Sequence, residues 1–138
     1  MTSILPLARW NFESGSGSVA KDTGRTAMFE GQLQNFRDNP FNGLIPRIDN
    51  FALEFDNLAG LPQDAVVVPN FPLPVSFSVS LWFQTTRRTA KATLFEHVTP
   101  TSQFAINWLP LFSVLQVVLR RGTRVSAPTI TALIPDNE

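Results

Sequence analysis

The sequence contains no cysteine, and this absence excludes both a disulfide framework and thiolate metal sites. It fits either a reducing compartment or a bacterial extracellular protein, so the compartment stays open. Histidine is nearly absent as well, because His97 is the only one. Without a second histidine, a cysteine or a convincing serine partner, neither a zinc site nor a hydrolase triad can be assembled around it.

An excess of charge is also lacking, since 11 Lys and Arg balance 11 Asp and Glu. No overall field would hold a polyanion, and nucleic acid is not expected as a partner. The first ten residues have no basic region, and their apolar stretch is short and broken by Pro6, which does not suit a signal peptide. No run is long enough to span a membrane, and no Asn-x-Ser/Thr acceptor appears. An extracellular or cell-surface location is expected only if the chain is part of a longer secreted protein.

Helical periodicity is poor throughout, whereas β-branched and aromatic residues are frequent and 11 prolines interrupt the chain. The length of 138 residues suits a single domain over residues 1–138. We therefore expect an all-β fold in which two antiparallel sheets pack as a β-sandwich. The expected strands cover residues 7–12, 28–33, 51–56, 65–68, 75–84, 92–97, 104–108, 114–120 and 129–133.

The run from Phe77 to Phe83 alternates large and small side chains with period two, which predicts a central strand. Two turns have a chemical basis: an Asx-type turn over residues 22–24 and a hairpin turn over residues 121–123, in which Gly122 takes a positive φ. The apolar segment 109–112 stands where a hairpin turn is normally polar. A buried turn or an interaction patch would each explain it.

Three blocks, residues 7–17, 19–33 and 52–83, resemble laminin-G-like domains of the concanavalin A-like lectin/glucanase superfamily. The first carries Trp10 and a Gly/Ser turn, the second Asp22 and Gly24, and the third ends in Trp82 and Phe83. The resemblance covers residues 7–83 and thins beyond residue 84. It implies a jelly-roll sandwich that binds carbohydrate or a protein surface. Strands that usually follow in this family are absent after residues 135–138, so we expect either a segment of a longer protein or a shortened sandwich with an open edge.

Catalysis is not expected, although Glu54 and Asp56 would share one face of a strand. Glycosidic cleavage needs paired carboxylates roughly 5 Å apart or wider. Glucanases of the superfamily carry a third acidic residue two positions further on, where this chain has Leu58. A solvated strand face is the preferred interpretation.

Laminin-G-like domains often hold calcium at the sheet rim with Asp and Asn oxygens, as suits a hard cation. The resemblance places Asp22, Asp56 and Asn57 at matching positions, and Ca²⁺ is the one cofactor it implies. In the alternative interpretation, Asp22 caps its own turn and Asp56 ends a strand.

Carbohydrate sites combine an aromatic face with planar polar groups. The available pieces are Trp108 beside Asn107, the pair Arg120 and Arg121 next to a turn, and His97 at a strand end. A core position is nevertheless the preferred interpretation for Trp108, and a solvated hairpin end is preferred for the arginines. Trp10 and Trp82 are expected in the core.

The sequence thus favours a non-catalytic binding module for carbohydrate or a protein surface. The alternative is a structural or assembly subunit that pairs with copies of itself, or with another chain, through an open sheet edge.

Overall fold

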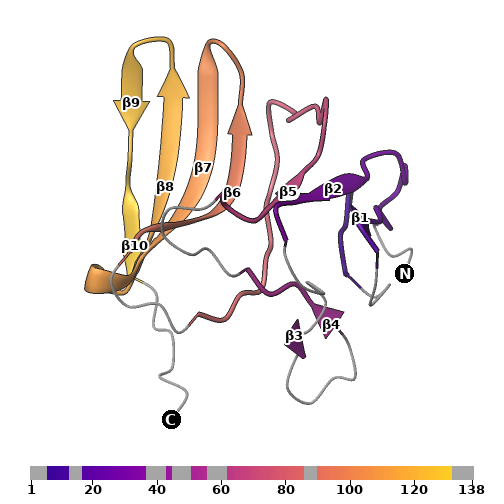
Figure 1. Ribbon diagram of the computed structural model, residues 1–138. Helices are drawn as coiled ribbons and strands as arrows, with labels where there is room; N and C mark the ends of the chain where they lie inside the picture. The colour runs from indigo at the N-terminus through magenta and orange to yellow at the C-terminus, as the bar shows by residue number, and fades with distance from the viewer. Residues whose placement is uncertain are drawn as a thin grey trace, which may run out of the picture. The chain divides into compact units, whose positions relative to one another are not determined.

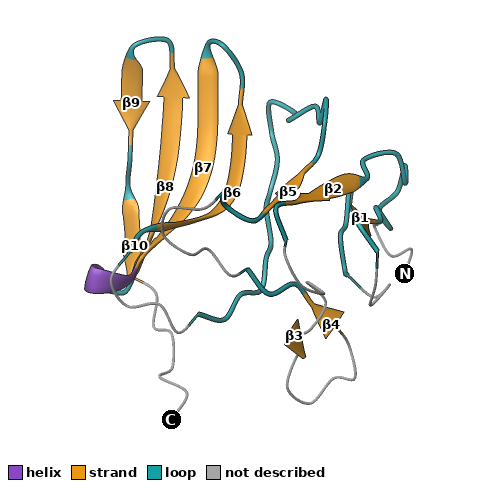
Figure 2. Ribbon diagram, viewed as in Figure 1, coloured by secondary structure: helices purple, strands orange, loops and turns teal. Residues whose placement is uncertain are grey.

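The computed structural model describes residues 6–12, 17–36, 43–44, 51–55, 62–85 and 90–131. These residues form ten strands and one 3-10 turn, with no α-helix among them (Figure 2). The all-β prediction is confirmed. No helix in the described ranges is long and apolar enough to cross a bilayer. The chain divides into two compact units, Met1–Pro72 and Leu73–Glu138.

Unit 1 contains a three-stranded antiparallel sheet in the order β1-β2-β5 and a separate antiparallel pair, β3-β4. In this unit the predicted strands at residues 28–33, 51–56 and 65–68 are present in part, whereas residues 7–12 form a single bridge from Trp10 to Asp22. The strands are β1 (Val19–Ala20), β2 (Gly31–Gln34), β3 (Gly43–Leu44), β4 (Phe51–Ala52) and β5 (Ala65–Val67).

Aromatic packing holds the described part of unit 1 together. The ring of Phe71 meets Trp10 and Phe29 edge to face, with centroids 5.8 and 5.0 Å apart. The indole Nε1 of Trp10 donates a 2.6 Å hydrogen bond to the carbonyl of Phe29. Gly31 allows close strand packing, because a Cβ there would lie 2.5 Å from the Cγ1 of Val66.

Unit 2 contains a five-stranded antiparallel sheet in the order β10-β8-β7-β6, with β9 pairing the other half of the same β8 edge (Figure 1). The long strands lie close to the predicted ranges, which confirms them. β9 is a short strand that the sequence did not predict. The strands are β6 (Ala92–Val98), β7 (Ser102–Leu109), β8 (Val114–Arg121), β9 (Arg124–Ser126) and β10 (Thr129–Thr131).

The register gives the sheet of unit 2 two distinct faces. On one face Phe104 stands between His97 and Leu119 of the neighbouring strands. On the other, Asn107 is buried and accepts a 3.0 Å hydrogen bond at Oδ1 from the hydroxyl of Thr93. The predicted apolar segment before β8 forms the 3-10 turn η2 (Pro110–Phe112).

The prediction of a central strand at Phe77–Phe83 is wrong, since residues 71–85 form no ladder with any described strand. The alternation is nevertheless visible in side-chain contacts. Phe77 packs edge to face on Phe104 with centroids 4.9 Å apart, and Phe83 lies 6.0 Å from Trp108. The expectation that Trp82 lies in the core is also wrong. Trp82 belongs to the other set of alternating positions from Phe77 and Phe83, and it is 98% exposed. Residues 77–83 thus attach by alternate side chains, without forming a ladder with any described strand.

Candidate functional site: an arginine-rimmed pocket in unit 2

Two hairpin turns of unit 2 form one rim of the candidate site. The β8–β9 turn is two residues long, and its first residue, Gly122, has φ +58° as the sequence predicted. The backbone N–H of Gly122 donates a 2.8 Å hydrogen bond to the carbonyl of Thr101 in the β6–β7 turn. That second turn is closed by a 2.6 Å contact between the hydroxyls of Thr99 and Ser102. The rim is therefore tied together by hydrogen bonds.

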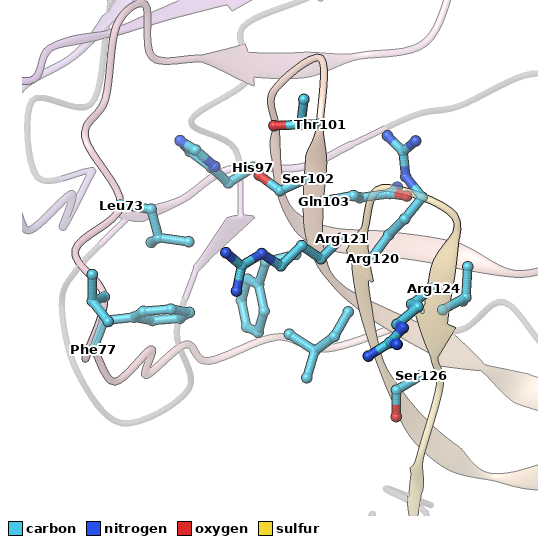
Figure 3. Close-up of a pocket in the computed structure, with 14 residues that line it drawn as sticks. Leu73, Phe77, His97, Thr101, Ser102, Gln103, Arg120, Arg121, Arg124 and Ser126 are labelled. Carbon is cyan, nitrogen blue, oxygen red and sulfur yellow. The ribbon is translucent and has the colours of Figure 1, made fainter.

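A pocket of about 640 Å³ opens beside these turns (Figure 3). This volume is in the range of small-ligand sites. The 14 described residues that line it all belong to unit 2. They come from the segment before the sheet, from the β6–β7 turn and from β6 to β9: Leu73, Val75, Phe77, His97, Thr101, Ser102, Gln103, Phe104, Leu119, Arg120, Arg121, Arg124, Val125 and Ser126.

The apolar part of the pocket is built on Phe104. Phe77 packs against it from the preceding segment, and Phe95 of β6 meets it with centroids 5.9 Å apart. Leu119 stands directly opposite Phe104 on β8 and remains 47% exposed. The apolar wall therefore has packed support behind it and an open surface in front.

The polar part of the pocket is cationic. Arg121 lies directly opposite Arg124 in the β8–β9 ladder, so both side chains start from the same face of the sheet. Figure 3 shows the side chain of Arg121 reaching toward Leu73 and Phe77, whereas the guanidinium of Arg120 points away from them. Among the described residues that line the pocket none is acidic, and within the described ranges Arg121 and Arg124 make no ion pair.

Like charges directly opposite in an antiparallel pair destabilise it, because their Cβ atoms are only about 5 Å apart. Each guanidinium group also offers a planar donor fork that matches carboxylate or sulfate oxygens, and these two side chains start from paired positions of the ladder. An anion between Arg121 and Arg124 would relieve the repulsion and satisfy these donors. The arrangement can therefore bind an anionic group.

Three of the five predicted ligand-binding residues, His97, Arg120 and Arg121, line this pocket together. The other two do not: Asn107 and Trp108 are buried, with 2% and 5% of their surfaces exposed. The indole Nε1 of Trp108 is buried and has no hydrogen-bond partner among the described residues. Neither residue lines the pocket, and a role for Asn107 and Trp108 in ligand binding stays a prediction.

Of the predicted calcium ligands, Asp56 and Asn57 lie outside the described residues. The carboxylate of Asp22 forms the predicted Asx turn and is 6% exposed. Its Oδ1 accepts hydrogen bonds from the backbone N–H groups of Arg9 at 2.9 Å and Gly24 at 2.7 Å, and its Oδ2 from Phe29 at 3.1 Å. Within the described ranges no group of three acidic, histidine or cysteine side chains could hold a metal ion.

Two effects oppose each other at the Asp22 carboxylate. Burial acts to raise its pKa, but backbone hydrogen bonds from Arg9, Gly24, Phe29 and Met28 together lower the pKa below the ordinary value of 3.8. These N–H dipoles point their positive ends at both oxygens, which disfavours a cation on the same side. The turn-capping interpretation of Asp22 accounts for the contact with Gly24, while the contacts with Arg9 and Phe29 tie the same carboxylate to segments outside the turn.

The sequence did not single out Arg124 and Phe77 as site residues. A signal for Arg124 was present: a two-residue turn at Gly122 and Thr123 places residues 121 and 124 opposite each other. For Phe77 no local signal existed, because its contact with Phe104 joins residues far apart in the chain.

Comparison with family models, with curated proteins and with solved structures found no match to this chain.

Proposed function

We propose that this chain is a non-catalytic binding module and that the pocket of unit 2 binds an anionic group of its ligand. The observation that supports this most is the cross-strand pair of Arg121 and Arg124, which lacks an acidic counterpart in the pocket lining. The sequence favours carbohydrate or a protein surface as the ligand, and both can present a carboxylate or sulfate.

The chemistry of the pocket supports binding rather than catalysis. No acidic side chain is present among the described lining residues to serve as a general base. The hydroxyl of Ser102, which lines the pocket, lies 2.6 Å from the hydroxyl of Thr99 and is engaged by it. A site that holds a ligand by guanidinium contacts and an apolar wall needs none of these groups.

Titration with sodium sulfate, followed by NMR of the ¹⁵N-labelled full chain, tests the proposal. We expect shifts at the backbone amides of residues 121–124, saturating with sulfate and weakened by sodium chloride, because exposed charges are screened. Arg121→Gln and Arg124→Gln should each weaken binding severalfold. Arg25→Gln, the same change at an exposed arginine of unit 1, is the matched control. The proposal would be refuted if sulfate caused only small amide shifts spread evenly over the chain, and if Arg121→Gln and Arg124→Gln showed the same shifts.

We also propose, on the sequence resemblance, that the sheets belong to a laminin-G-like jelly-roll sandwich. The two antiparallel sheets of three and five strands support it at the level of fold class. An experimental structure with the strand connections and the packing of the sheets resolved is the test.

Assembly through self-association is the second candidate function, and one surface feature favours it. Leu111 and Phe112 of η2 are 72% and 73% exposed, so the predicted apolar segment is a surface patch rather than a buried turn. Light scattering after size exclusion distinguishes the candidates. A monomer of 15.3 kDa at high concentration would refute self-association.

A further inference from the structure

The apolar wall of the pocket lies next to its charged rim on the same strand. Leu119 and Arg121 are two residues apart on β8, so their side chains leave the same face of the sheet about 6.6 Å apart. Leu119 and Phe77 both expose apolar surface to the pocket, as does Val75. A ligand that fills the pocket must therefore place apolar surface close to its anionic group.

This juxtaposition distinguishes the two ligand classes that the proposed function leaves open. An acidic sugar surrounds its carboxylate with hydroxyl groups, which would lose water against Leu119 and Phe77 without gaining hydrogen bonds. An extended peptide with an apolar side chain two residues from Glu or Asp presents both groups on one side, about 6.6 Å apart. Its spacing matches that of Leu119 and Arg121 on β8.

We infer that the pocket recognises a partner protein through an exposed extended segment in which a large apolar side chain lies two residues from an acidic one. The carboxylate is bound between Arg121 and Arg124, and the apolar side chain lies against Leu119 and Phe77. This inference rests on the proposed anion site and specifies the partner that supplies the anion.

Four probes test it, each titrated into the ¹⁵N-labelled full chain: acetyl-Gly-Phe-Gly-Glu-Gly-amide, the same peptide with Phe replaced by Gly, the same peptide with Glu replaced by Gln, and glucuronate. We expect the peptide with both Phe and Glu to bind about tenfold more tightly than the peptide without Phe and than glucuronate, since burying a large apolar side chain is worth about one power of ten. It should also bind severalfold more tightly than the Gln peptide, which lacks the charge that the arginines bind.

Variants separate the two contacts. Leu119→Thr introduces another residue that favours strands. It should reduce the affinity for the peptide with Phe and Glu severalfold, and it should leave the affinity for the peptide in which Gly replaces Phe unchanged. Arg121→Gln should weaken both Glu peptides to the same degree. Val98→Thr, at an exposed strand position outside the pocket lining, is the control for the apolar substitution. Circular dichroism of each variant confirms that it folds.

The outcomes distinguish failure of this inference from failure of the proposed function. Equal binding of all three carboxylates, or tightest binding of glucuronate, would overturn the peptide inference and leave the anion site intact. Absence of binding by every carboxylate and by sulfate would overturn both. Tight binding of the Gln peptide would show that the apolar wall acts alone and would also overturn the inference.

Discussion

Arg121 of β8 lies directly opposite Arg124 of β9, across a two-residue turn at the rim of a pocket lined in part by apolar side chains. Natural strand pairs avoid like charges in this position, because the repulsion opposes pairing. A bound anion would offset this repulsion and would explain why two arginines lie opposite each other. The same geometry links the local stability of the hairpin to occupancy of the pocket.

Reversing one charge of this pair should stabilise the chain and abolish anion binding together. In the absence of ligand, Arg124→Glu replaces repulsion with attraction across the ladder, and we expect the free energy of unfolding to rise by about 0.5 kcal/mol. Urea denaturation with and without sulfate measures both effects. Loss of stability in sulfate-free buffer would contradict the prediction.

Gly122→Ala should weaken the β8–β9 hairpin. Space is not the reason, because a Cβ at Gly122 meets no atom within 4 Å. The φ of +58° is the reason, since an L side chain in this conformation costs about 1 kcal/mol. Urea denaturation should show that loss, and amide exchange should be faster in residues 119–126. Gly17→Ala, also at a positive φ in open space, shows whether the loss is specific to the hairpin.

Asp22 should make the stability of the chain depend on pH in the acid range. Its folded pKa lies below the unfolded value of 3.8, so its contribution is fully present above the unfolded value and is lost as pH falls through the folded one. We expect Asp22→Asn to lower the free energy of unfolding at pH 7 by about 2 kcal/mol, because backbone N–H groups lose a charged acceptor. Between about pH 5 and pH 3, a range that includes the ordinary carboxyl pKa, the variant should lose less free energy of unfolding than the unmodified chain.

Thr93→Val should destabilise unit 2 despite the better strand propensity of valine. The hydroxyl of Thr93 donates a hydrogen bond to the Oδ1 of Asn107, and Asn107 is only 2% exposed. Valine would leave this buried acceptor unsatisfied, which costs about 1–2 kcal/mol. Thr129→Val is the control, because Thr129 makes no side-chain hydrogen bond within the described ranges and is exposed. Thermal unfolding of both variants makes the comparison, and equal melting temperatures would count against the contact.

Chelation tests the calcium site that the resemblance implies for Asp22, Asp56 and Asn57. Because backbone N–H groups, those of Arg9, Gly24 and Phe29 among them, already donate to the carboxylate of Asp22, we expect EDTA and excess CaCl₂ to give the same melting temperature. A melting temperature that rises with calcium, and does so less in Asp22→Asn, would instead support the calcium site.

Much of unit 2 could be predicted because its signals are local. Residues 92–97 and 114–120 favour strands through their own β-branched and aromatic side chains, and the structure places β6 and β8 there. The failure at Phe77–Phe83 has a physical cause. Period-two alternation predicts which side chains face the sheet, and Phe77 and Phe83 do contact β7. It does not reveal whether a neighbouring backbone is available for pairing.

The sequence predicted several residues of the candidate site better than it predicted how they are arranged. His97, Arg120 and Arg121 could be selected as polar groups near strand ends, and they line one pocket. The core position that the sequence offered for Trp108 is confirmed, since this residue is 5% exposed. The exposure of Trp82 was not accessible, because it depends on which side of the chain is covered by residues distant in sequence.

By itself, the sequence determined the all-β class, the turn capped by Asp22 and the hairpin turn at Gly122. Each of these follows from the conformational and hydrogen-bonding preferences of a few adjacent residues. Only the tertiary structure decided that Arg124 lies opposite Arg121 and that Phe77 and Leu119 form a wall beside them. Register and packing decide these positions, because they depend on the simultaneous burial and pairing of segments far apart in the chain.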